Sequence, residues 1–202
     1  MAMAQPFQAT RRLQSPFAPA DFARDVAPLA ALYLTVAAAT EQLRRARSDR
    51  ARPVARFVNL LLVSLLTGNG VGGERFVHAP LSGLPPARYL EAEQAITRSY
   101  LPMLAIMPAS IVSGLQVLSL MPKRRGAAFW LTVAGTVGMI GTFVTTLLEL
   151  PLNRQTLTST AEAPDEWMRN RGTWVRFNHV RTLLEVGAWA CLCVGALAER
   201  GR

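Results

Sequence analysis

The sequence predicts an all-α integral membrane protein, a bundle of four membrane-spanning helices preceded by an N-terminal extension. Half of the 202 residues are hydrophobic, and they are gathered in blocks instead of recurring at the spacing of a helix face or a strand. A block of about 20 largely uncharged residues can cross the ~30 Å hydrocarbon core as a helix. Four such blocks in one short chain are more than the core of a soluble domain explains. The predicted spans cover residues 54–74, 101–121, 127–150 and 179–198.

The basic residues predict how the spans are oriented. The net charge is +9, from 22 Lys and Arg against 13 Asp and Glu. Basic residues cluster at 44–56, 123–125 and 200–202, which lie on one side of the membrane if there are four spans. The positive-inside rule then places both termini in the cytoplasm, with the protein in the cell membrane. The lipid bilayer is the predicted partner, and nucleic acid is not, because the sequence lacks an RNA-binding aromatic pattern, a zinc-ligand spacing and a basic zipper.

Residues 1–52 form the predicted extension, and residues 53–202 form the transmembrane domain. The first 25 residues contain three Arg, two Asp and three Pro without an apolar run, so we predict no cleavable signal peptide. Val26–Thr40 is apolar but short, and Pro28 interrupts it. We predict an interfacial or packed helix there, with a fifth membrane segment as the alternative, and partial disorder in the rest of the extension.

Two further segments have recognisable ends. Pro85 and Pro86 suit a helix start, and the mixed charges after them predict a short amphipathic helix before the second span. Pro151 lacks a backbone N–H and disfavours helix at the residue before it. The third helix is therefore predicted to end at the membrane surface, with Glu149 at the break and Asn153 in a turn.

Polar residues on the third and fourth spans share helix faces. Thr142, Thr146 and Glu149 fall within about 40° of one another on a helical wheel. On the fourth span, Asn178, Thr182 and Glu185 lie on one face, with Arg181 about 60° to one side and His179 about 100° to the other. An ion pair between Arg181 and Glu185, four residues apart, is predicted because it would stabilise a carboxylate within the membrane.

In a four-span topology, the end of the first span, the end of the third and the start of the fourth lie at one membrane face. Both His residues of the chain are there, together with two carboxylates. We predict a pocket at this mouth of the bundle, formed by Glu74, His78, Glu149, Asn153, Asn178, His179 and Arg181.

Three motifs resemble the anthrone-oxygenase-like family of small four-helix membrane proteins. They are a glycine-rich first span, the Pro-Leu-Asn at residues 151–153, and a Trp-bearing helix start, WMRNRGTWVRFNHVRT, from Trp167 to Thr182. The resemblance covers about residues 54–198. It implies oxidation of an anthrone, a polycyclic phenolic ketone, to a quinone by molecular oxygen without flavin or haem. By motif matching it designates Asn153, Trp174, His179 and Arg181 as site positions.

The side chains suit this oxygenase chemistry. A His near neutrality can remove a proton from an acidic methylene, and an Arg can stabilise the enolate or phenolate oxygen that results. A Trp offers an aromatic face to a planar substrate. The predicted catalytic residues are His179, Arg181 and Glu149, and the predicted substrate-binding residues are Asn153, Trp174 and Asn178.

Alternatives stay open within and outside the enzyme class. A divalent metal would be held by Glu74 and His78 together with His179, since two His and one carboxylate are a known ligand set. No nicotinamide-binding glycine pattern, P-loop or nucleophile elbow occurs in the sequence. The non-catalytic alternative is a multi-pass membrane protein that serves as a subunit, a chaperone or a carrier of a lipophilic small molecule. A homo-oligomer is compatible with every one of these interpretations.

Overall fold

The structure, a computed structural model, describes residues 38, 51–100, 103–121, 126–159 and 164–200. The predicted extension, with the segment Val26–Thr40, lies outside the described residues except for Ala38, Ala51 and Arg52. The described part of the chain is helical and holds no strand. Its elements are α2 (Ala51–Gly72), the π-helix η1 (Gly73–His78), α3 (Ala79–Leu81), α4 (Pro86–Ser99), α5 (Met103–Leu120), α6 (Ala127–Thr158) and α7 (Pro164–Arg200).

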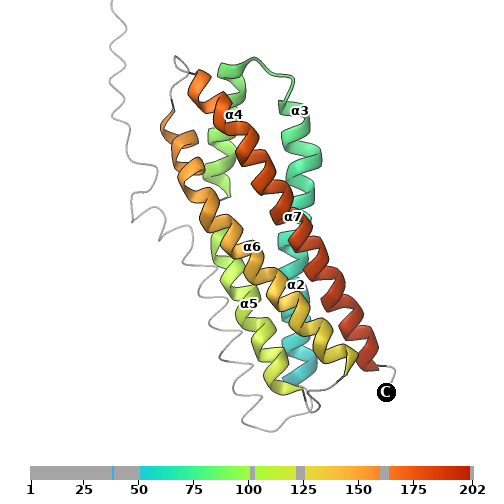
Figure 1. Cartoon of the computed structure of the whole chain (residues 1–202). Helices are drawn as coiled ribbons and strands as arrows, with labels where there is room; N and C mark the ends of the chain where they lie inside the picture. Colours follow the sequence, from blue (N-terminus) through green and yellow to red (C-terminus); the bar gives the residue numbers. More distant parts are fainter. Residues whose placement is uncertain (1–37, 39–50, 101–102, 122–125, 160–163, 201–202) are drawn as a thin grey trace, which may run out of the picture.

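Four helical stretches are long and apolar enough to cross a membrane. They are Ala51–Leu81, Met103–Leu120, Ala127–Thr158 and Asn170–Glu199. In Figure 1 they run side by side, with α4 at one end of the bundle and the start of α2 and the end of α7 at the other. Contacts join α2 to α5, α5 to α6, α6 to α7 and α7 back to α2, so the four helices form a closed ring. The predicted all-α four-helix membrane bundle is confirmed.

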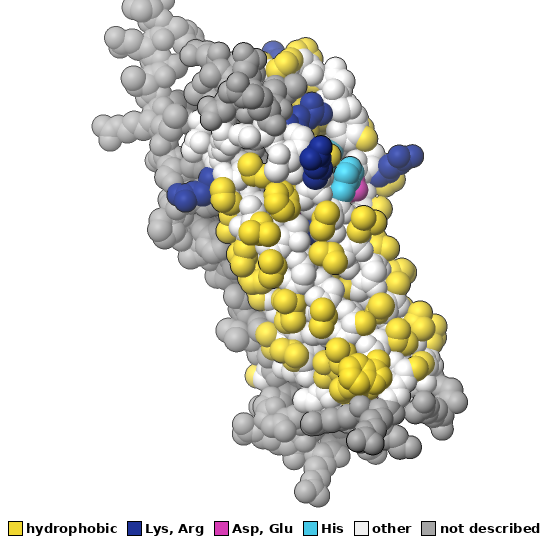
Figure 2. All heavy atoms as spheres, viewed as in Figure 1, with side chains coloured by type: hydrophobic (Ala, Val, Ile, Leu, Met, Phe, Trp, Pro, Cys, Tyr) yellow, Lys and Arg dark blue, Asp and Glu magenta, His cyan; other side chains and the backbone are white. Residues whose placement is uncertain are grey.

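The outer surface of the bundle is apolar over most of its length. Large hydrophobic side chains are exposed on every span, among them Phe57, Val112, Trp130 and Leu183. Figure 2 shows hydrophobic side chains over the middle and lower part of one face, with charged side chains and a His gathered at the upper end. An apolar surface of this extent is unfavourable in water but is suited to contact with lipid chains. At this upper end, called the charged end below, the helices extend beyond the part of the surface where hydrophobic side chains are exposed.

Inside the ring, small and polar residues bring the helices together. A Cβ atom at Gly135 would stand 2.9 Å from the Ala188 carbonyl oxygen, so α6 and α7 approach closely only because Gly135 has no side chain. Asn59 on α2 donates to the Ser110 carbonyl and to the Ser113 hydroxyl, each at 3.0 Å, and joins α2 to α5. Small-residue packing and such hydrogen bonds hold helices together where lipid removes the hydrophobic driving force.

One predicted boundary was wrong. The third helix does not end near Pro151, because α6 continues without interruption to Thr158. A Pro removes one helical hydrogen bond, but packing against neighbouring helices can hold the backbone in place. Asn153 therefore lies on a helix, one turn beyond Glu149, and not in a turn. The fourth helix begins at Pro164, ahead of the predicted span at residues 179–198, because a hydrophobic block marks only the part of a helix that lipid surrounds.

Candidate functional site

A cavity of about 90 Å³ lies at the charged end of the bundle. Part of its wall is apolar and comes from Leu66 on α2 and from Met103, Leu104 and Met107 on α5. Most of the remaining wall is polar, with residues from α2, η1, α4, α6 and α7. Of the predicted pocket residues, His78, Glu149, Asn153 and Arg181 line it, and so does Trp174, which the family resemblance predicted as a site residue. A cavity with an apolar floor and a few converging polar groups is typical of a small-molecule site.

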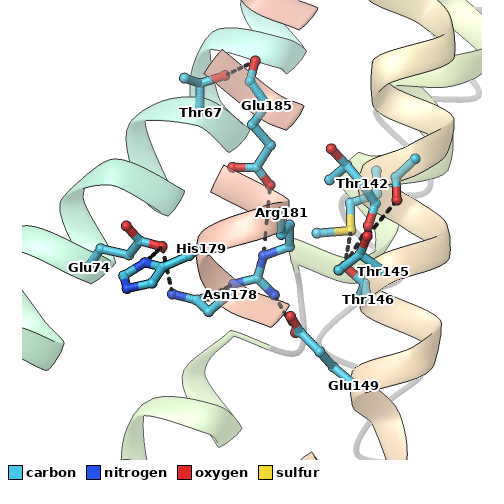
Figure 3. A network of polar contacts seen from close by, with 12 residues as sticks. Thr67, Glu74, Thr142, Thr145, Thr146, Glu149, Asn178, His179, Arg181 and Glu185 are labelled. Atoms are coloured by element: carbon cyan, nitrogen blue, oxygen red, sulfur yellow. Dashed lines mark hydrogen bonds and ion pairs between the residues drawn. The ribbon is translucent and has the colours of Figure 1, made fainter. Parts of the chain in front are cut away.

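Arg181 is the centre of the polar network at this cavity (Figure 3). Its Nη1 donates to Oε2 of Glu149 at 2.8 Å, and its Nη2 donates to Oδ1 of Asn178. The Nε atom lies 3.9 Å from Oε1 of Glu185. Glu149 is 0% and Glu185 is 2% exposed, so one guanidinium compensates two carboxylates that are out of contact with solvent. The predicted pairing with Glu185 is present, but the shorter contact is to Glu149 on another helix.

The network continues from Asn178 to η1. Nδ2 of Asn178 donates to Oε1 of Glu74 at 3.2 Å, and the same oxygen lies 2.9 Å from Nδ1 of His179. These contacts tie α7 to the end of the first span. The side chain of His179 is 60% exposed, and it does not line the cavity. Consecutive helix residues point about 100° apart, so the inward Asn178 turns the predicted catalytic residue His179 away from the cavity.

Trp174 joins α7 to α6 at the cavity wall. Its Nε1 donates to Oδ1 of Asn153 at 2.8 Å. Trp174 and Arg181 are seven residues apart, so both face the cavity from the same side of α7. The helical position of Asn153, one turn beyond Glu149, is what brings it within reach of Trp174. These two predicted substrate-binding residues are therefore brought together, whereas the third, Asn178, contacts Arg181 and Glu74 and does not line the cavity.

The three predicted metal ligands do not converge. Glu74 contacts His179, whereas Nδ1 of His78 lies 3.4 Å from Oε2 of Glu93. Within the described residues, no three His, Cys, Asp or Glu side chains form a group that could hold a metal ion.

Helix α4 contributes site residues that the sequence analysis missed. Glu93, Thr97 and Tyr100 line the cavity from α4 and its C-terminal cap, and Glu93 is almost fully buried. Their spacing of four and three residues was the available signal, since it places all three on one helix face. Burial and the nearby Glu93 charge raise the pKa of the Tyr100 hydroxyl above its ordinary value. Tyr100 is thus a hydrogen-bond donor at neutral pH.

Comparison with known proteins bears on residues from the end of α4 onward. The anthrone oxygenase family model matches residues 95–191, which include Glu149, Asn153, Trp174 and Arg181 and leave α2 and η1 outside. No curated protein and no solved structure matched the chain. The matching family is the one that the sequence motifs predicted, and the similarity covers residues 95–191, just under half of the chain.

Proposed function

We propose that the protein is a membrane-embedded oxygenase that oxidises a lipophilic, anthrone-like aromatic with molecular oxygen in this cavity. The family match supports an oxygenase-like role. The observation that carries the proposal is the Arg181 guanidinium, held in the cavity wall by Glu149 and Asn178. A fixed cation beside a partly apolar cavity is suited to stabilise an oxyanion that forms on a bound aromatic.

The proposed reaction needs no external reductant. The methylene of an anthrone is acidic because its anion delocalises onto the ring carbonyl oxygen, and the resulting enolate is electron-rich enough to react with oxygen. Overall, the methylene and one O₂ give a new carbonyl and one water. Arg181 would donate to the enolate oxygen. Its guanidinium has five N–H groups, and the contacts to Glu149, Asn178 and Glu185 do not use all of them.

The cavity wall also suits a substrate with phenolic hydroxyls. Oε1 of Glu149 and Oε2 of Glu185 are buried and have no hydrogen-bond partner within the described residues. Leaving a buried acceptor unpaired is unfavourable by about 1–3 kcal/mol. Phenolic O–H groups on the substrate would donate to these oxygens, while the Trp174 ring and the apolar wall would contact its fused rings. Such a substrate dissolves in the bilayer and could enter from it.

Turnover of a simple anthrone by the detergent-purified protein tests the proposal. We expect oxygen uptake and quinone formation at equal rates, both faster than autoxidation in protein-free micelles. Under ¹⁸O₂, one labelled atom should appear in the new carbonyl. Turnover no faster than autoxidation across a series of hydroxylated anthrones would contradict the proposal. The better account would then be a non-catalytic membrane protein whose polar cluster holds the helices together.

We also propose that both termini are cytoplasmic and that the protein resides in the cell membrane. The three basic clusters favour this orientation. Because the start of α2 and the end of α7 share one end of the bundle (Figure 1), the cavity would lie toward the opposite side of the membrane. Reporter fusions after Arg125 and after Arg202 should report cytoplasm, and fusions near Ala87 and Ala163 should report the other side. A cytoplasmic signal near Ala87 would reverse the orientation.

A further inference from the structure

A buried histidine–carboxylate pair lies in the cavity wall and has no part in the Arg181 network. The side chain of His78 is 14% exposed, and its Nδ1 lies 3.4 Å from Oε2 of the buried Glu93. Both residues line the cavity. The chain has two His, and the other, His179, faces away from the cavity. Any imidazole chemistry in the cavity therefore falls to His78.

Two features of the fold place His78 here. It is the last residue of η1, a single π-helical stretch within an otherwise α-helical span. The wider turn of a π-helix shifts the residues that follow around the helix axis, and such turns are frequent at functional sites. The ring of Trp174 then stands edge-on to the imidazole, with ring centroids 4.9 Å apart and an interplanar angle of 72°. The imidazole thus packs against the Trp174 ring and has Nδ1 3.4 Å from Oε2 of Glu93.

Glu93 is held just as firmly, because its neighbours fasten α4 to two other helices. Tyr89 and Leu90 are buried against Leu81 of α3. Nε2 of Gln94 donates to the carbonyls of Thr156 at 3.0 Å and Ser159 at 2.9 Å. These carbonyls belong to the end of α6, where helix carbonyls lack partners within their own helix. The helix that carries Glu93 is therefore held in place, with the Glu93 carboxylate 3.4 Å from Nδ1 of His78.

The geometry leaves the second imidazole nitrogen for a ligand. The Glu93 carboxylate, 3.4 Å from Nδ1 but not hydrogen-bonded to it, favours a proton on that nitrogen by its negative charge. Nε2 is then the atom that can accept another proton. A Cβ atom at Gly73 would stand 3.9 Å from Nε2 of His78 and 3.2 Å from the Tyr100 hydroxyl oxygen. Both polar atoms therefore lie close to Gly73, and both residues line the same part of the cavity wall. A carbon acid bound there would meet a base and a hydrogen-bond donor together.

We infer that His78 is the general base of the proposed oxidation and that Glu93 is its positioning residue. The inference rests on the proposed function. Nε2 takes a methylene proton and leaves the enolate, and Glu93 stabilises the imidazolium that forms. Oxygen then adds to the former methylene carbon of the enolate, and the imidazolium returns the proton to the resulting peroxide. Loss of water gives the quinone carbonyl, so both methylene hydrogens end in water and the oxygen molecule accepts all the electrons.

Anaerobic hydrogen–deuterium exchange at the substrate methylene isolates the proposed step from the reaction with oxygen. In D₂O without oxygen, the wild-type protein should accelerate exchange above the protein-free rate. His78→Gln should reduce both this acceleration and aerobic turnover by roughly 10²–10⁴-fold, with substrate affinity and melting temperature retained. Glu93→Gln should reduce exchange less. Arg88→Gln, an exposed substitution on α4, is the matched control and should change nothing.

The outcomes separate the two proposals. If the wild type oxidises anthrones and His78→Gln exchanges and turns over normally, His78 is not the base and the oxygenase proposal stands. If the wild type neither exchanges nor oxidises, the proposed function fails first. Should His78→Gln not fold, His78→Ala with added imidazole replaces it, and recovery of exchange with imidazole concentration supports the base. Exchange that falls in His179→Gln but not in His78→Gln would overturn the inference.

Discussion

Replacing Arg181 by Ala should lower the free energy of unfolding by about 3–5 kcal/mol. The substitution leaves Glu149, which is 0% exposed, and Glu185, which is 2% exposed, without the cation that both contact. Asn178 loses its donor at the same time. An uncompensated buried charge is far more unfavourable than the loss of a hydrogen bond between neutral groups. Chemical unfolding in mixed detergent micelles, followed by circular dichroism, measures the change.

Two further variants show whether charge is the cause. Arg181→Met combined with Glu149→Gln and Glu185→Gln should recover most of the lost stability, since no buried charge is then left alone. Arg88→Ala should change stability by less than about 1 kcal/mol, because its partner Glu91 is exposed and solvent screens the pair. An Arg181→Ala protein as stable as the wild type would show that the two carboxylates do not depend on this guanidinium.

Replacing Arg181 by Lys should retain the fold and reduce turnover by roughly 10²–10³-fold, the usual effect of removing one oxyanion donor. The ammonium keeps the positive charge beside Glu149 and Glu185. It lacks the planar fork that lets a guanidinium hold Glu149 and Asn178 and still donate to a substrate oxygen. We expect the loss in kcat, with KM changed little, because the donor is needed most when charge develops on the oxygen.

Steady-state oxygen uptake and a melting curve on the same preparation test this expectation. A stable Arg181→Lys protein with wild-type turnover would remove Arg181 from the chemistry and leave it a structural role. A fall in kcat that accompanies a large fall in melting temperature would be a folding effect, and the Arg181→Ala series above measures that effect directly.

Much of the site could be predicted because helix faces follow from local spacing. The predicted faces are buried as expected, Thr142 and Thr146 on α6 and Asn178 and Thr182 on α7. The convergence of three span ends at one mouth followed from the number of spans alone. The spacing of residues within one helix could not predict which residue of another helix each polar side chain contacts. The Arg181–Glu149 bond joins residues 32 positions apart, and it depends on α6 remaining helical through Pro151.

By itself, the sequence determined the fold class. The length and polarity of a hydrophobic block are local properties, and they alone decide whether a segment can cross the hydrocarbon core as a helix. It also determined that the polar groups collect at one end. Only the tertiary structure decided which His enters the cavity. The π-turn of η1 and the docking of α4 bring His78 beneath Glu93, while the inward face of α7 leaves His179 outside. The rotation of each helix about its own axis is set by packing against all its neighbours, and no single segment carries that information.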